Sequence, residues 1–391
     1  MRIGYTNDSY PERRTILEGN LNELVRLKSF NRYYIGAVNK RIPYLKNTSK
    51  SVFFETVFKF QYVDGLHFFN SITKNNTPWV STYETCIPRL STMSFFKEEG
   101  SLEQQQKEKR YAEKYVKILA NDNCRKIIAL SKINQRMQED FLNYFPDYKE
   151  KIMNKMVQLY PPQKKIVTRE FVEKKQTNKV IHFLFVGKFF NLKGGNEIVD
   201  VFDKIYKETN YKFKLTLVSL GDMNNHAFGD FFDSPEYLQK SKQKIDACPS
   251  IEWIHYIENK ELLEMMKHYD VGILPSWGDT FGYSILEMQA TGIPVISSNI
   301  RAFEEINNEK TGWIIQLPLS KYKEIHFNSL KEKIQQRKNM QNKLEEIVLD
   351  ILAHPEQLKE KRIAAYDQVT KQHSTEKYFE KLNQIYKESF L

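Results

Sequence analysis

Residues 271–298 read VGILPSWGDTFGYSILEMQATGIPVISS, and the rest of the chain can be placed around them. Val271 to Leu274 is a short apolar run that ends at a proline, and a turn around Gly282 follows. Ile285 to Ala290 starts a helix that stops at a glycine, and Pro294 to Ser298 runs as a second strand. The stretch therefore predicts a strand, helix, strand unit of an α/β fold.

Two carboxylates lie at positions of this unit where ligands bind. Asp279 is in the turn after the first strand, and Glu287 follows eight residues later in the helix. The carboxyl edge of a parallel sheet binds ligands, and the unpaired N–H groups at a helix start favour an anion there. Both carboxylates can therefore reach a polyhydroxyl ligand held over the helix start. Alternatively, Asp279 only caps the helix and Glu287 is a solvated helix residue.

Length and composition indicate a globular protein of two domains. The chain has 391 residues, of which 41% are apolar and 13% are aromatic, and this excludes global disorder. Three cysteines show no metal-ligand or redox spacing, which indicates reduced thiols in a cytosolic setting. The N-terminus begins with a strand-like run, and no apolar run reaches the length of about 18 residues that a membrane span needs. We therefore expect a soluble, cytoplasmic protein.

The positive charge is concentrated in the first half. Residues 1–180 carry 32 Lys and Arg against 19 Asp and Glu, whereas residues 181–391 carry 27 against 30. This asymmetry favours an anionic partner, such as a phospholipid surface, a lipid-linked diphosphate or an acidic polymer, although a plain Lys-rich surface fits as well. Ser101 to Ala120 is expected to form a basic helix with interspersed aromatic residues. Such a helix either lies on an anionic membrane surface or is a solvated helix with one apolar face packed on the core. No zinc-finger spacing or ribonucleoprotein motif supports nucleic-acid binding.

The first half predicts alternating strands and helices. Arg2 to Thr6 is the first expected strand, and Thr15 to Leu27 is an expected amphipathic helix. Lys126 to Leu130 is the last clear strand, and Ser131 stands where an N-cap belongs. Further expected strands are Tyr33–Val38, Leu66–Asn70 and Pro78–Tyr83, and a basic stretch runs from Lys40 to Lys50.

The second half opens after a Lys-rich segment from 163 to 179, the expected linker. Residues 181–187 are almost all apolar, as a strand buried on both faces of a parallel sheet requires. Lys188 and Lys193 lie in the loop that follows, before a helix beginning near Gly195, and this position favours anion binding over simple solvation. Further expected strands are Phe213–Ser219, Ile251–Tyr256 and Gly312–Gln316, and further helices are Asn259–His268, Tyr322–Leu352 and Glu356–Lys371.

Residues 271–298 resemble the donor-binding signature of retaining glycosyltransferases of family 4, in which two acidic residues bracket a turn that ends in Phe-Gly. The loop with Lys188 and Lys193 is similar to the Gly-Arg…Lys-Gly loop of that family. The resemblance implies a GT-B fold, with two Rossmann-like domains facing each other across a cleft and a C-terminal helix, Thr375 to Ser389, that crosses back to the first domain. The expected domains are residues 1–165 with about 375–391 for the acceptor, and residues 166–374 for the donor.

The same resemblance implies roles for individual residues. Lys188 and Lys193 would hold the diphosphate, Glu287 the ribose and Asp279 the donor sugar, and Glu84 would take the place of a family His near the reacting sugar. A buried, structural Glu84 is the alternative. The implied catalytic residues are Asp279, Lys193, Lys188 and Glu84. The implied donor-binding residues are Gly187, Lys188, Lys193, Tyr256, Ile257, Asp279, Thr280, Phe281, Gly282, Tyr283 and Glu287.

Several residues depart from the family pattern. Asp279 replaces the usual Glu, Lys188 replaces the common Arg and keeps its charge without the bidentate fork, and the first loop, after Thr6, lacks the family's glycines. The last departure leaves acceptor recognition open. Together with Glu84 in place of the family His, it also motivates a rival hypothesis, a catalytically silent GT-B subunit that binds or stabilises a partner transferase.

The resemblance thus implies a retaining, metal-independent glycosyltransferase. It would use a UDP- or GDP-linked sugar as co-substrate, with no other cofactor, and a glycan, lipid-linked or protein acceptor. It would act in synthesis of a glycan, a glycolipid such as a cell-surface polysaccharide precursor, or a glycoprotein. Nucleic acid is not an expected partner, and a peripheral position on the cytoplasmic face of a membrane is compatible with the charge distribution.

Overall fold

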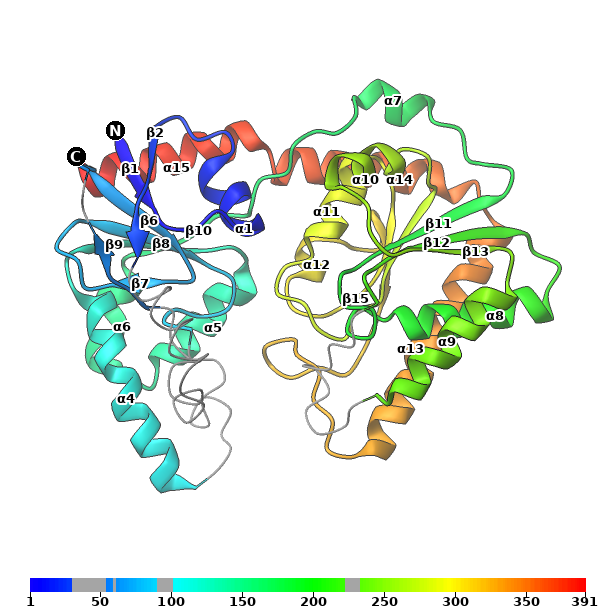
Figure 1. Cartoon of the computed structure of the whole chain (residues 1–391), viewed down its shortest axis with the longest axis horizontal. Coiled ribbons are helices and arrows are strands. Elements are labelled where there is room, and N and C mark those ends of the chain that lie inside the picture. The colour runs from blue at the N-terminus through cyan, green and yellow to red at the C-terminus, as the bar shows by residue number, and fades with distance from the viewer. Residues whose placement is uncertain (30–53, 59–60, 90–100, 222–232) are drawn as a thin grey trace. The chain divides into compact units, whose positions relative to one another are not determined.

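The computed structural model describes residues 1–29, 54–58, 61–89, 101–221 and 233–391 (Figure 1). It divides into two compact units. The first contains Met1–Pro162 and His373–Leu391, and the second contains Gln163–Gln372. The sequence analysis predicted domain boundaries at 165/166 and 374/375, and the observed boundaries are at 162/163 and 372/373. The strand candidate at residues 33–38 and the basic stretch at 40–50 lie outside the described residues.

The second unit is built on a six-stranded parallel sheet with the order β13-β12-β11-β14-β15-β16. Numbered within the unit, this is 3-2-1-4-5-6, the order of a Rossmann-type doubly wound sheet. Helices cover both faces of the sheet, and the central strands β11 and β14 are accordingly apolar except for His182. The strands are β11 (Ile181–Val186), β12 (Phe213–Val218), β13 (Ile251–Ile254), β14 (Val271–Leu274), β15 (Val295–Ser298) and β16 (Gly312–Ile315).

The helices of the second unit include one inside the expected linker. Arg169–Lys174 forms α7, which Thr168 caps and whose Val172 is fully buried, so this part of the linker packs on the second unit. Helix α13 begins at Leu330, where Ser329 accepts a hydrogen bond from the Glu332 amide, and not at Tyr322 as expected. The others are α8 (Gly195–Glu208), α9 (Pro235–Ala247), α10 (Asn259–Met266), α11 (Tyr283–Ala290), α12 (Phe303–Ile306) and α14 (Gln357–Gln372).

The first unit contains a second six-stranded parallel sheet, in the order β10-β9-β8-β6-β1-β2. Its strands are β1 (Arg2–Tyr5), β2 (Glu23–Arg26), β6 (Gly65–Phe69), β8 (Trp79–Tyr83), β9 (Cys124–Ala129) and β10 (Met156–Gln158). Two small pairs accompany it, β3 (Lys28–Ser29) with β5 (Val57–Phe58) and β4 (Phe54–Glu55) with β7 (Ile72–Thr73). Its helices include α4 (Leu102–Ala120), α5 (Lys132–Leu142) and α6 (Pro146–Met153), and Ser131 caps α5 as expected.

The prediction of an amphipathic helix from Thr15 to Leu27 is wrong. A short helix α1 (Tyr10–Glu12) continues into a π-helical turn η1 (Arg13–Leu17), which ends before Gly19. Gly19 has φ +95°, a left-handed conformation that breaks a helix. The residues after it form strand β2 beside β1, because Leu24 and Val25 suit a strand as well as a helix.

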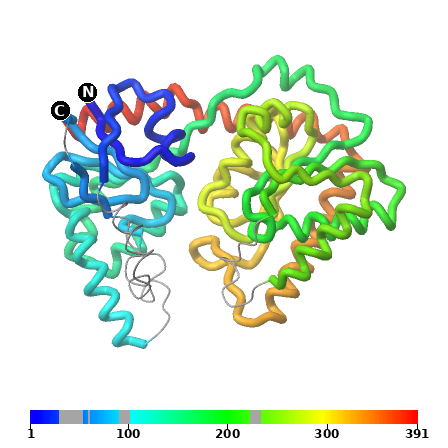
Figure 2. The backbone as a smooth tube through the Cα atoms, viewed as in Figure 1, coloured from blue at the N-terminus to red at the C-terminus, as the bar shows by residue number. Residues whose placement is uncertain are grey.

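The C-terminal helix α15 (Thr375–Phe390) packs on the sheet of the first unit, as the fold prediction required (Figure 2). Leu382 and Tyr386 are fully buried in one apolar cluster with Ile3, and the Tyr386 hydroxyl lies 2.6 Å from Nδ1 of the buried His67. The two Rossmann-like units with this returning helix confirm the predicted GT-B class of fold. Among the described residues, no helix has both the length and the apolar character needed to span a membrane.

Candidate functional site

The candidate site lies at the carboxyl edge of the sheet of the second unit, where β11 and β14 are neighbours. In the observed strand order this is the switch point, because chain connections leave β11 and β14 toward opposite sides of the sheet. Open α/β sheets bind ligands in the crevice that forms there. The loop after β11 carries Lys188 and Lys193, and the loop after β14 carries Asp279. The fold thus brings together three of the residues selected from the sequence.

Two glycines let these loops approach each other closely. A Cβ atom on Gly187 would lie 2.9 Å from Cβ and Cγ of Lys193, so a side chain at Gly187 would displace the lysine. Gly194 has φ +83°, and a Cβ atom there would lie 2.5 Å from the carbonyl oxygen of Pro275. Only glycine fits both the left-handed backbone and the contact at position 194. The lysine loop therefore rests directly on the start of the loop after β14.

Lys193 and Asp279 form an ion pair at the centre of the site. The Lys193 ammonium also donates to the carbonyl oxygen of Gly278 at 2.9 Å. The side chains are only 15% and 17% exposed, so solvent screens the pair less than it would a surface pair. Sequence spacing could not show this contact, because 86 residues separate the partners.

The other oxygen of the Asp279 carboxylate is held by the turn in front of helix α11. Oδ1 accepts from the amide of Thr280 at 2.7 Å and from the amide of Phe281 at 3.2 Å. The N-cap residue itself is Gly282, with φ +96°. Asp279 therefore organises the turn before the helix, and the amide of Phe281, one of the implied donor-binding residues, donates to this carboxylate in the structure.

Serine hydroxyls fix the loop that delivers Asp279, and the sequence analysis did not select them. Ser276 Oγ donates to the carbonyl oxygen of Gly278 at 2.9 Å and lies 3.2 Å from that of Leu192. Ser298, at the end of β15, donates to the carbonyl oxygen of Ser276 at 2.7 Å. Both serines are fully buried. Ser298 is the last residue of β15 and Ser276 stands two residues after β14, and these positions at strand ends were the only signal in the sequence.

Glu287 and Lys188 differ sharply in exposure. Glu287 is 6% exposed on α11, so the alternative of a solvated helix residue is wrong. Lys188 is exposed, with its ammonium 5.4 Å from the centre of the Phe189 ring. Ser219, at the end of β12, donates to the Lys188 carbonyl oxygen at 3.3 Å and so holds the backbone of this loop.

The expected base-contact residues follow β13, the edge strand next to β12. Tyr256 is 69% exposed and donates through its hydroxyl to Glu258, while Ile257 is half-buried. Trp253, at the end of the same strand, stacks on Phe190 with a centroid distance of 4.7 Å. This stack links the loop after β11 to β13, and sequence reasoning missed it.

Glu84 lies in the first unit, after β8, where loops from three strands meet. Its carboxylate accepts from the Asn70 side chain at 3.3 Å and lies 3.8 Å from the Arg89 guanidinium. Asn134 donates to its backbone carbonyl oxygen at 2.7 Å. The side chain is 13% exposed, and these partners fix its orientation. Within the described ranges, no three His, Cys, Asp or Glu side chains are grouped to hold a metal ion.

Residues 167–346, all within the second unit, match the sequence model of the family Glycosyl transferases group 1. An uncharacterized 41.2 kDa protein in the cps region of Klebsiella pneumoniae is 26% identical over 151 residues, which are 37% of each chain. An uncharacterized glycosyltransferase of Methanocaldococcus jannaschii is 26% identical over 156 residues, or 40% of this chain and 36% of that one. The alignments thus span little more than a third of these relatives.

Three solved structures resemble the whole chain. A glycosyltransferase of Rickettsia africae is 17% identical with a TM-score of 0.56, covering 99% of this chain and 98% of that one. WaaG, a glycosyltransferase involved in lipopolysaccharide biosynthesis, is 14% identical with a TM-score of 0.57, covering 98% and 99%. HepE of Anabaena in complex with UDP-glucose is 12% identical with a TM-score of 0.54, covering 98% of both. At these identities the similarity establishes the fold.

Proposed function

We propose that this chain, whose second unit carries a Glycosyl transferases group 1 segment, is a glycosyltransferase that takes a sugar from a nucleotide-sugar donor. The observation that carries the proposal is the meeting of Lys193 and Asp279 at the switch point between β11 and β14. A cation and a carboxylate side by side suit a ligand that is anionic at one end and polyhydroxylated at the other. A sugar nucleotide has these two ends.

The chemistry follows from where charge develops. Departure of a nucleoside diphosphate builds negative charge on its phosphates, and preorganised cations stabilise that charge in the transition state. Lys193 is held in place by Asp279 and Gly278, and exposed Lys188 lies on the same loop, so both can supply this charge. We therefore propose transfer that needs no divalent metal, with Asp279 accepting hydrogen bonds from the donor sugar.

The finer assignments belong to the same proposal. Glu287 would bind the ribose hydroxyls, and the loop with Tyr256 and Ile257 would contact the base. Attack on the oxocarbenium-like centre from the face that the diphosphate leaves would retain the anomeric configuration without a protein nucleophile. Glu84 is proposed to act near the reacting sugar through the carboxylate that Asn70 and Arg89 orient.

The donor is proposed to be UDP- or GDP-linked, with UDP favoured because HepE, of the same fold, binds UDP-glucose. The acceptor class is proposed as a glycan or a lipid-linked glycan, with a protein acceptor as the alternative. Support comes from the involvement of WaaG in lipopolysaccharide biosynthesis and from the place of the Klebsiella relative in a cps region. A cytoplasmic location, peripheral to a membrane, completes the proposal.

Purified full-length protein tests the function directly. UDP, GDP and their glucose and mannose derivatives are screened by thermal shift, since a ligand that binds only the folded state raises its melting temperature. Slow hydrolysis of the stabilising sugar nucleotide, measured by release of nucleoside diphosphate, is the expected enzymatic result. Binding without any turnover would favour the rival silent subunit, and no shift with any nucleotide would refute the donor site.

A further inference from the structure

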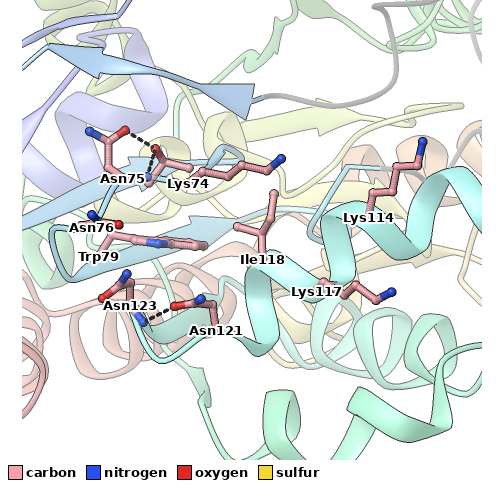
Figure 3. Close-up of a pocket in the computed structure, with 10 residues that line it drawn as sticks. Lys74, Asn75, Asn76, Trp79, Lys114, Lys117, Ile118, Asn121 and Asn123 are labelled. Carbon is pink, nitrogen blue, oxygen red and sulfur yellow. Dashed lines mark hydrogen bonds between the residues drawn. The ribbon is translucent and has the colours of Figure 1, made fainter.

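A pocket of 420 Å³ opens on the first unit, away from the residues assigned above (Figure 3). It lies between helix α4 and the turn from β7 to β8, and Trp79 is one of its lining residues. Trp79 starts β8 and Glu84 directly follows the end of that strand, so the two are about 16 Å apart along the sheet. The pocket is therefore at the amino edge of the sheet, opposite the edge that carries Glu84.

The charge of the pocket is positive. Lys74 from the turn and Lys114 and Lys117 from α4 line it, and the described residues contribute no carboxylate to the lining. Glu113 pairs with Lys117 at 3.0 Å, which neutralises one of the three lysines. Within the described part of the chain, the ammonium groups of Lys74 and Lys114 have no acceptor. Two positive charges thus remain for a ligand.

The remaining lining is rich in amides, and part of it is held rigidly. The Asn75 side chain donates to the Val57 carbonyl oxygen at 3.0 Å and accepts from the Thr73 hydroxyl at 2.8 Å. Asn121 accepts from the Asn123 amide at 2.9 Å. These bonds fix the side chains of Asn75 and Asn121, and the side chains of Asn76 and Asn123 also line the pocket. Such a lining suits a polyhydroxyl ligand better than an apolar one, because amides both donate and accept hydrogen bonds.

We propose that this pocket is an accessory binding site for an acidic saccharide, meaning a sugar unit that bears a carboxylate or a phosphate. Lys74 and Lys114 would bind the anionic group, while the amides of Asn76 and Asn123 would bind hydroxyls. The volume is within the range of small-molecule sites and fits one or two sugar units. The site is separate from the proposed donor site, and the proposal does not rest on transferase activity.

The test is a binding titration of the full-length protein followed by methyl NMR. Ile118 lines the pocket and is 7% exposed, so its methyl resonance reports a ligand in this pocket and not in the second unit. Digalacturonate supplies carboxylates, glucose 1-phosphate supplies a phosphate, and maltose is the neutral reference. We expect saturable shifts of Ile118 with one or both acidic sugars, weakening as salt is raised, and none with maltose.

Matched variants separate the pocket from general charge. Lys74→Ala with Lys114→Ala should weaken binding of the acidic sugar about tenfold or more. Lys107→Ala with Lys377→Ala removes the same charge from exposed helix positions of the first unit and should leave binding unchanged. The proposal is overturned by equal shifts with maltose, by no saturation with either acidic sugar at millimolar concentrations, or by equal losses in both double variants.

Discussion

Replacing Lys193 by Met should separate its role in binding a diphosphate from its role in packing. The aliphatic part of Lys193 fills the space beside Gly187, and Met preserves that contact while it removes the ammonium. A hydrogen bond to a charged partner contributes about 1.5–3 kcal/mol, so Lys193→Met should weaken UDP binding about 10-fold to 150-fold. The remaining Asp279 carboxylate, now without its cation, would add repulsion of the diphosphate.

Asp279→Asn should act in the opposite direction on UDP. Asparagine keeps an oxygen for the amides of Thr280 and Phe281, so the turn should persist. Loss of the carboxylate frees Lys193 for the diphosphate. A weak ion pair contributes up to about 1 kcal/mol, so we expect UDP binding that is unchanged or up to about fivefold tighter. The same variant should transfer sugar poorly, because it removes the negative acceptor proposed for the donor sugar.

Calorimetry with UDP measures both effects on the same protein preparations. Lys207→Met, on the exposed side of α8, removes one charge elsewhere in the second unit and is the control. Thermal melts establish that each variant is folded. Equal weakening by Lys193→Met and Asp279→Asn would mean that the pair acts as a structural unit, and unchanged affinity in Lys193→Met would refute the diphosphate role.

Four further outcomes are expected. Glu287→Gln should reduce the preference for UDP over its 2′-deoxy analogue, measured by competition, and an unchanged preference would remove Glu287 from the ribose site. Transfer activity should persist in excess chelator, and a loss that Mg²⁺ or Mn²⁺ restores would contradict the metal-independent mechanism. Burial lowers the pKa of His67 from 6.5 to about 3. The neutral buried ring therefore costs no stability above pH 6.5, and the free energy of unfolding falls by about 1.4 kcal/mol per pH unit as the pH falls toward 3. Denaturant unfolding of His67→Gln should show a weaker dependence of this free energy on pH than the parent, and an equal dependence would exclude His67 as a cause of the acid destabilisation. Vesicle co-sedimentation should show salt-sensitive binding to anionic lipid through the basic first half, and equal binding to neutral lipid would exclude an electrostatic membrane contact.

Local patterns in the sequence predicted elements whose signals are local. The strand at Val271–Leu274 was predicted to the residue, because an apolar run is bounded there by Asp270 and Pro275. Residues 15–27 were misread, because the spacing of their apolar side chains fits a helix and only Gly19 signals the break. The choice of a strand came from pairing with β1, a tertiary contact.

Within the site, the sequence by itself determined which residue types stand after which strands, and hence that two lysines and an acidic residue could meet a phosphorylated sugar. The tertiary structure decided which of them touch. Strand order made β11 and β14 neighbours, and this brought Lys193 to Asp279. The packing of other elements buried Glu287 and stacked Trp253 of β13 on Phe190. Periodicity reports whether a side chain faces a core, but partners far apart in sequence are chosen by the packing of whole elements.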